Sequence, residues 1–308
     1  MTAGRNVSVV IITRNRCREL LRTLDELAKL PEQPALIVLD NGSTDGTAPT
    51  VRDTYPQLCL IELGRNAGSA ARNVGVAAAA TPYVAFADDD SWWTAGSLTR
   101  AVGLFESHPR LALVAGLVLI GPDRVPEPTC LAMAASPLPA EPDLPGPPIL
   151  GFIACGAVVH RQRFLAVGGF PERYGVGGEE TPLAIELASA GWGMAYVPDI
   201  VALHYPSPSR DQARRQAILV RNELWLAWAR RSGTVALSKT AAVARRLPSD
   251  PPARAGLAAA VAGGFEVLRH RAPVPGWLER KLRILDGAAH LDARHQPQRD
   301  HAVNSRTE

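Results

Sequence analysis

The sequence is poor in the features that mark secreted or zinc-binding proteins. Its cysteines lie far apart, and they form no C-x-x-C pair and no zinc-type spacing with histidine. We therefore expect free thiols in a reducing cytoplasm. The four positions are Cys17, Cys59, Cys130 and Cys155.

Long apolar runs and a strong charge are also missing. The longest uncharged apolar runs, 111–120 and 255–265, are much shorter than the ~20 residues needed to span a bilayer. A strand-like run already begins at Val7, so we expect no signal peptide. The net charge of +3 is too small to indicate a nucleic-acid partner. We expect a soluble, cytoplasmic protein that at most rests on the inner face of the cell membrane.

The sequence does contain a regular alternation of strand and helix patterns. With 308 residues, 46% of them hydrophobic, it can form a full core. Short runs rich in β-branched residues alternate with segments of helical periodicity, which predicts βαβ units. The fold class is therefore α/β, with a Rossmann-like, mostly parallel sheet flanked by helices. Strands are expected at 7–12, 35–39, 58–63, 83–87, 111–119, 152–160 and 192–197, and a basic helix at 210–231.

Two segments depart from this alternation. Residues 121–150 carry nine prolines, which favours a long irregular loop that shapes the acceptor side of a site. From residue 232 the chain becomes a series of basic, Ala/Leu-rich helical stretches, and its end is polar. We predict an α/β domain at 1–231, a helical C-terminal extension at 232–290 and a disordered tail at 291–308.

Three consecutive carboxylates, Asp88, Asp89 and Asp90, directly follow the expected strand 83–87. Ligands of open α/β sheets bind beyond the carboxyl ends of the strands. Carboxylates placed there offer the hard oxygen ligands that Mg²⁺ or Mn²⁺ prefers. An acidic triplet can also be a solvated turn, and the surrounding motifs must decide between the two interpretations.

Those motifs occur in a fixed order over about 7–204. They are V-V-I-I-T-R-N-R at the first strand, V-L-D-N-G-S-T-D-G-T at the second, G-R-N-A-G-S-A-A-R-N-V-G after the third, A-D-D-D after the fourth, and a late G-G-E-E. In this combination the chain resembles the inverting glycosyltransferases of family 2, which have the GT-A fold. The resemblance implies a GT-A-like domain that transfers a sugar from a nucleoside diphosphate sugar to a hydroxyl acceptor.

The first strand ends are expected to hold the donor nucleotide. Asp40 is placed to accept hydrogen bonds from the base or ribose, although its segment is also compatible with a simple βα turn and helix cap. Arg65 and Asn73 are candidates for contacts with the base or a phosphate. The donor-binding candidates are Thr13, Arg14, Asn15, Asp40, Asn41, Arg65, Asn73, Asp88 and Asp89.

The resemblance also assigns a metal site and a base. A divalent cation, Mn²⁺ or Mg²⁺, would bridge the donor diphosphate and neutralise the charge of the leaving group, with Asp88, Asp90 and His204 as ligands. Glu180 is the expected general base, with Glu179 as the alternative. Since Glu180 would begin a helix, we expect a depressed pKa and an ionised carboxylate at neutral pH. The alternative interpretation is that the two glutamates are only favourable acids at a helix N-terminus.

The acceptor side is the least defined part of the predicted site. Trp93, Gly178 and Trp192 are the candidates for it, although aromatic residues are more often part of a core. The acceptor itself is a cell-envelope glycan, a lipid-linked sugar or a small molecule. The basic C-terminal segment favours either peripheral contact with an anionic membrane or a solvated helical cap.

Two other functions are alternatives to sugar transfer. A dinucleotide-dependent oxidoreductase would need G-x-G-x-x-G in the first βα turn, which instead reads Thr-Arg-Asn-Arg-Cys-Arg. A non-catalytic nucleotide-sugar-binding partner or scaffold stays the alternative to a metal-dependent, inverting glycosyltransferase.

Overall fold

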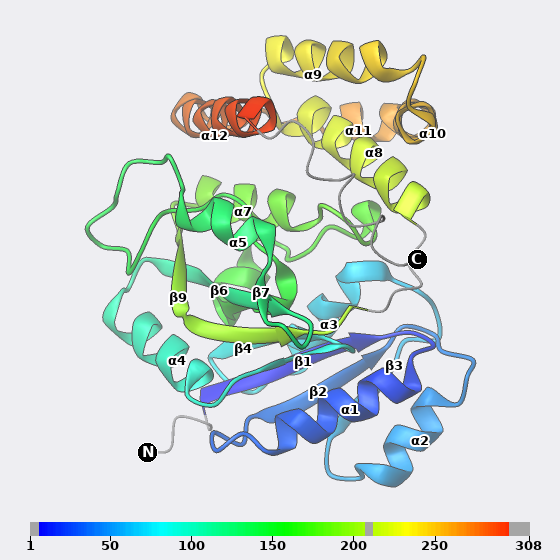
Figure 1. Ribbon diagram of the computed structural model, residues 1–308, viewed down its shortest axis with the longest axis vertical. Coiled ribbons are helices and arrows are strands. Elements are labelled where there is room, and N and C mark those ends of the chain that lie inside the picture. The colour runs from blue at the N-terminus through cyan, green and yellow to red at the C-terminus, as the bar shows by residue number, and fades with distance from the viewer. Residues whose placement is uncertain (1–5, 207–211, 296–308) are drawn as a thin grey trace, which may run out of the picture.

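The computed structural model describes residues 6–206 and 212–295, in which helices flank one mixed sheet (Figure 1). The strand order is β3-β2-β1-β4-β8-β6-β9-β5, and β7 pairs with β6. The strands are β1 (Val7–Thr13), β2 (Ala35–Asp40), β3 (Cys59–Glu62), β4 (Tyr83–Asp88), β5 (Ser91–Trp93), β6 (Leu111–Ile120), β7 (Val125–Pro126), β8 (Ala157–His160) and β9 (Gly193–His204). The helices are α1 (Cys17–Ala28), α2 (Thr47–Thr54), α3 (Ala71–Ala78), α4 (Ser97–Ser107), α5 (Pro128–Ala134), α6 (Arg161–Ala166), α7 (Glu180–Ser189), α8 (Gln212–Arg230), α9 (Gly233–Arg246), α10 (Pro251–Ala262), α11 (Gly264–Arg269) and α12 (Gly276–His295).

The first four strands in this order are parallel and set the position of the site. The β-branched run of β1 is buried along its length, as expected for a strand covered on both faces. In the sheet register Thr13 lies beside Asp40, and Ile12 lies beside Asp88. The carboxyl ends of β1, β2 and β4 therefore meet at one edge, which confirms the predicted α/β class.

The other half of the sheet is mixed. Strand β8 runs antiparallel to both β4 and β6, whereas β9 is parallel to β6 and antiparallel to β5. Strand β9 is longer than its sequence pattern suggested and continues through Pro198 to His204. Its register with β5 places His204 beside Ser91, the residue that directly follows the acidic triplet. This pairing brings together residues more than one hundred positions apart.

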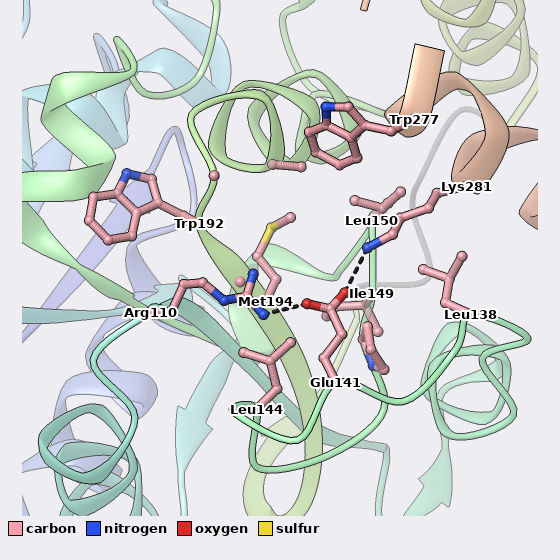
Figure 2. Close-up of a pocket in the computed structure, with 14 residues that line it drawn as sticks. Arg110, Leu138, Glu141, Leu144, Ile149, Leu150, Trp192, Met194, Trp277 and Lys281 are labelled. Atoms are coloured by element: carbon pink, nitrogen blue, oxygen red, sulfur yellow. Dashed lines mark hydrogen bonds and ion pairs between the residues drawn. The ribbon is translucent and has the colours of Figure 1, made fainter. Parts of the chain in front are cut away.

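The expectation that residues 121–150 contain no regular elements is wrong. The segment includes β7 and α5. Helix α5 forms because Pro128 occupies a first-turn position, where no backbone N–H is needed, and the side chain of Glu127 accepts a hydrogen bond from Thr129 N at 2.6 Å. Later in the segment, Glu141 pairs with both Arg110 and Lys281 (Figure 2). Because Lys281 belongs to α12, this second pair connects the segment to that helix.

Helices α8 to α12 pack at one end of the molecule, away from α1 and α2 (Figure 1). Gly256 of α10 lies against α8 so closely that a Cβ there would come within 2.7 Å of Ala217 O. In the same group of helices, buried Arg231 pairs with two acids of α12, with Glu279 at 3.0 Å and with Asp286 at 2.7 Å. None of the helices in the described residues is long and apolar enough to cross a membrane.

The predicted chain boundaries are only partly covered by the described residues. Helix α12 continues to His295, so it includes the first residues of the segment expected to be a disordered tail. Residues 296–308 of that tail, and 210–211 of the expected basic helix, lie outside the described residues. The division into a catalytic domain, a helical extension and a tail stays a prediction.

Candidate active site

A cleft of about 680 Å³ opens at the carboxyl edge of the parallel strands. Its walls come from the ends of β1, β4 and β9, from the start of α7 and from the start of α8. This volume falls in the range of small-molecule sites. The charged residues that line it are Arg14, Arg16, Arg72, Asp88, Asp89, Asp90, Glu127, Glu179, Glu180, His204, Arg214 and Arg215.

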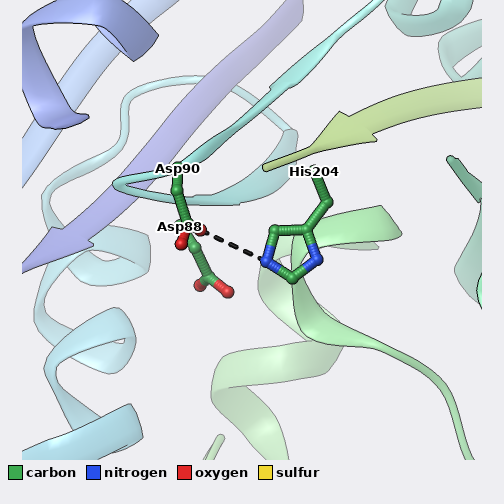
Figure 3. A group of neighbouring side chains, drawn as sticks. All are labelled: Asp88, Asp90 and His204. Atoms are coloured by element: carbon green, nitrogen blue, oxygen red, sulfur yellow. Dashed lines mark ion pairs between the residues drawn. The ribbon is translucent and has the colours of Figure 1, made fainter. Parts of the chain in front are cut away.

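Asp88, Asp90 and His204 form the acidic centre of this cleft (Figure 3). One ligand atom from each lies within 4.8 Å of the others. A tight turn holds the carboxylates, because Ser91 Oγ accepts a hydrogen bond from Asp88 N at 2.8 Å. His204 Nε2 points at Asp90 Oδ1 across 3.3 Å. Two carboxylates and an imidazole that converge in this way fit a divalent metal such as Mn²⁺.

Arg16 compensates the charge of the triplet and was not among the predicted site residues. Its guanidinium contacts Asp89 Oδ1 at 3.1 Å and donates to Asp90 Oδ2 at 2.8 Å. Burial would raise the pKa of Asp90, but the contact with His204 and the charge of Arg16 hold that pKa below its usual value. Burial raises the pKa of Asp89 to about 7 against the opposing effect of Arg16. Asp89 also accepts a hydrogen bond from Thr13 Oγ1 at 3.1 Å, and it does not belong to the converging group of Asp88, Asp90 and His204.

Arg72 is a second cation of the cleft that was not among the predicted site residues, although it is adjacent in sequence to the candidate Asn73. Its guanidinium is 3% exposed and lies 2.5 Å from Asp88 and 3.8 Å from Glu179. The sequence feature that could have identified Arg72 is the spacing of Ala71, Arg72 and Gly75, which lie on one buried face of α3. Asn73 lies one helix position away, and its amide bonds with the backbone of Phe170.

The glutamate pair stands at the start of α7, as predicted. Glu179 is buried and accepts a hydrogen bond from Gly177 N, whereas Glu180 is partly exposed to the cleft. Burial and then the neighbouring charge of Glu179 raise the pKa of Glu180 to about 8. The expectation of a depressed pKa is therefore wrong. Desolvation and like-charge repulsion outweigh the favourable helix N-terminus.

The predicted nucleoside side is assembled by the ends of β1 and β2. Thr13, Arg14 and Asn41 line the cleft. Asp40 is buried and accepts a hydrogen bond from Ser43 N at 3.0 Å. Asn15 has a φ of 54°, and its side chain accepts from Thr44 N at 2.7 Å. These bonds make the β2–α2 turn part of one rigid edge with the β1–α1 turn.

Asn41 has a clear structural task within that edge. Its amide donates to Gly68 O and accepts from Ala67 N, both at 2.9 Å. This residue therefore fixes the loop before α3, and with it the position of Arg72. The βα turn that the sequence left as one alternative is therefore present, and the donor-binding role of Asp40 and Asn41 stays a prediction.

Six predicted site residues are not among those that line the cleft in the described part of the chain. Two of them, Asn15 and Asp40, make the turn contacts described above. Arg65 is exposed and pairs with Glu172, and Asn73 is used by the backbone of Phe170. Trp93 is 1% exposed and donates from Nε1 to Phe86 O at 3.0 Å, so it is a core residue. Trp192 lies in a separate pocket near Arg110 and Trp277 (Figure 2), with Arg163 over its ring. Of the acceptor-side candidates only Gly178 lines the cleft in the described part of the chain.

Comparisons with known proteins agree with this geometry. A sequence model described as glycosyl transferase family 2 matches residues 8–166. An N-acetylglucosaminyl-diphospho-decaprenol L-rhamnosyltransferase of Mycobacterium tuberculosis is 29% identical over 245 residues, which are 68% of this chain and 80% of the relative. A pre-mycofactocin glycosyltransferase of the same species is 32% identical over 69% of this chain and 46% of the relative.

Solved structures share the fold. A mannosyltransferase from Pyrobaculum calidifontis in complex with GDP-Man and Mn²⁺ superposes with a TM-score of 0.57 at 20% identity, over 95% of this chain and 88% of the other. TarS residues 1–349 from S. aureus, in complex with UDP-GlcNAc, gives 0.54 at 17% identity, over 72% of this chain and 66% of the other. The fold is thus that of the GT-A glycosyltransferases.

Proposed function

The chain belongs to glycosyl transferase family 2, and from this premise we propose that it transfers a sugar, with inversion, from a nucleoside diphosphate sugar to a hydroxyl acceptor. The observation that carries the proposal is the convergence of Asp88, Asp90 and His204 within 4.8 Å in the cleft. A mannosyltransferase of the same fold was solved with a nucleotide sugar and Mn²⁺, which supports a divalent metal here as well.

In this proposal each charged group of the cleft has a separate task. Asp88, Asp90 and His204 would hold Mn²⁺ or Mg²⁺, which when bound supplies positive charge beside the donor diphosphate. Contacts with His204 and then with Arg16 keep the pKa of Asp90 low, so its carboxylate stays ionised and can bind the cation. The edge formed by Thr13, Arg14, Asn15, Asp40 and Asn41 would hold the nucleoside.

Glu180 is the proposed general base. It faces the cleft, and its pKa of about 8 lies close to neutral pH, which balances the ionised fraction of a base against its driving force for accepting a proton. The acceptor oxygen forms a bond to the anomeric carbon as its proton passes to Glu180. The bond from that carbon to the diphosphate breaks, and the nucleoside diphosphate leaves on the opposite face. Glu179 is held by Gly177 N and Arg72, which favours Glu180 for this role.

The acceptor is proposed to be a hydroxyl of a cell-envelope glycan precursor. The rhamnosyltransferase relative acts on a sugar linked through a diphosphate to decaprenol. In this chain Arg214 and Arg215 line the cleft at the start of α8 and offer positive charge to such a diphosphate. Gly178, shortly before α7, lines the same cleft and would leave room for the acceptor sugar.

The test is donor hydrolysis and transfer with a panel of nucleoside diphosphate sugars, with Mn²⁺ and with chelator. We expect metal-dependent turnover with one donor class. The Glu180→Gln variant should bind the donor but lose transfer by about 10²–10⁴-fold. Donor binding without turnover in the wild-type protein, across lipid-linked and small-molecule acceptors, would instead favour a nucleotide-sugar-binding scaffold.

A further inference from the structure

A second concave surface lies on the C-terminal helices. An open groove of about 540 Å³ is formed by α8, α9, α10 and α11, and it shares no lining residue with the catalytic cleft. Figure 1 shows α9, α10 and α11 together at the end of the molecule opposite α1 and α2. Its floor is apolar and includes Trp228, Leu237, Val261, Phe265 and Leu268.

Large apolar side chains are unusually exposed in this groove. Phe265 is 81% exposed, Leu237 73%, Val261 65% and Leu268 53%. Four of the eleven exposed large hydrophobic residues in the described part of the chain therefore gather at one place. A contiguous apolar patch of this kind on a folded protein marks an interaction surface.

The rim of the groove is basic. Arg271 lines it directly. Arg269 is exposed on α11, four residues after Phe265, and so lies on the same helix face. Arg254 is exposed on α10, seven residues before Val261, and its Nη1 donates to Leu247 O.

The wider segment has the same sign of charge. Residues 232–290 contain nine Lys and Arg against four Asp and Glu, a net charge of +5. An exposed acid close to the groove, Glu266 of α11, pairs with His270 at 2.9 Å. The surface thus combines an exposed apolar floor with a positive rim, the chemistry of a helix surface that lies in a membrane interface.

We propose that this groove docks the protein on an anionic phospholipid bilayer. Phe265, Leu237 and their apolar neighbours enter the headgroup region, while Arg254 and Arg269 contact lipid phosphates. Arg271, whose guanidinium donates to Trp228 O and Arg231 O, adds positive charge at the rim. Charge complementarity favours a bilayer over a second copy of the chain, because two copies would place like charges against each other. The inference does not depend on the glycosyl-transfer chemistry, since the groove and the cleft share no residue.

The experiment is co-sedimentation of the full chain with vesicles of phosphatidylglycerol and with vesicles of phosphatidylcholine. We expect partition into phosphatidylglycerol vesicles that falls as salt is added. The Leu237→Ser/Phe265→Ser pair should lower this partition by roughly tenfold or more, because each large apolar side chain contributes strongly when buried. Arg269→Gln should lower it about fivefold on phosphatidylglycerol and leave phosphatidylcholine unchanged.

Leu131→Ser is the matched control, because Leu131 is 58% exposed on α5 and lies outside the groove. Circular dichroism establishes that each variant is folded. Absence of partition into phosphatidylglycerol, or an equal loss in the control, would overturn the proposal. So would a dimer in light scattering that only the groove variants disrupt. Vesicle binding by a protein that transfers no sugar would refute the proposed function and leave the docking surface standing.

Discussion

The Arg72→Met substitution is expected to destabilise the fold and to slow catalysis at neutral pH. The Arg72 guanidinium is almost fully buried and lies against Asp88 and Glu179. Methionine fills much of the same space but carries no charge. The two carboxylates would then face each other in the cleft without the cation that separates them.

The size of the effect follows from the burial of these groups. Removing one partner of a buried ion pair costs about 3–5 kcal/mol. Because Asp88 keeps 30% of its side chain exposed to water, we expect the lower end, about 3 kcal/mol. At about 2–4 °C per kcal/mol, the melting temperature should fall by roughly 6–12 °C.

The same change should move the pH profile. The charge of Arg72 lowers the pKa of Glu180, which burial and Glu179 raise to about 8. Without Arg72 this pKa rises further, so the proposed base is protonated over a wider range of pH. The kcat/KM of the variant should therefore reach its plateau at a higher pH than that of the wild-type protein.

Thermal unfolding and a pH series of kcat/KM measure the two effects. Arg65→Met is the matched control for stability, because Arg65 pairs with Glu172 on the surface, where such pairs contribute about 0–1 kcal/mol. Equal melting temperatures for the two variants would refute the burial argument. An unshifted pH midpoint in Arg72→Met would show that its charge does not act on the base.

Three further outcomes are expected. In the wild-type protein kcat/KM should rise with pH and level off above about pH 8, because Glu180 must lose its proton to act as the base; a profile already flat at pH 6 contradicts this role. His204→Ala should reduce the melting-temperature increase that Mn²⁺ gives in the presence of a nucleoside diphosphate, and an unchanged increase would exclude His204 as a ligand. Glu141→Gln should lower the melting temperature by about 2–4 °C, because it weakens partly exposed contacts to Arg110 and Lys281 worth on the order of 1 kcal/mol; an unchanged value would mean that these contacts do not hold the proline-rich segment on α12.

The α/β class and the site's main carboxylates followed from the sequence because they depend on local patterns. A buried β-branched strand such as β1, followed by helical periodicity, predicts a parallel βα arrangement without any tertiary information. A carboxylate at the end of such a strand, as Asp88 is in β4, must then lie at the carboxyl edge of the sheet. The start of α7 at Glu180 could also be predicted from the sequence, because glycines precede it.

Other parts of the site depended on long-range contacts. His204 was expected near Asp88 and Asp90 only because of the family resemblance. The antiparallel pairing of β5 and β9 brings it to Asp90, and no local pattern specifies that register. The rotation of α3 turned Arg72 into the cleft and its neighbour Asn73 toward Phe170. A rotation of this kind is set by packing against the sheet, which single-residue motifs do not record.

Burial was the second quantity that the sequence did not supply. Trp93 was a candidate for binding the acceptor, but its ring is buried in the core of the sheet and its N–H donates to Phe86 O. Glu180 looked like an ordinary helix-terminal acid, but desolvation and the charge of Glu179 raise its pKa to about 8. The sequence by itself determined which chemical groups stand at the ends of the strands. Only the tertiary structure decided which of them share a desolvated cleft, because solvent exclusion and long-range register arise when the whole chain is packed.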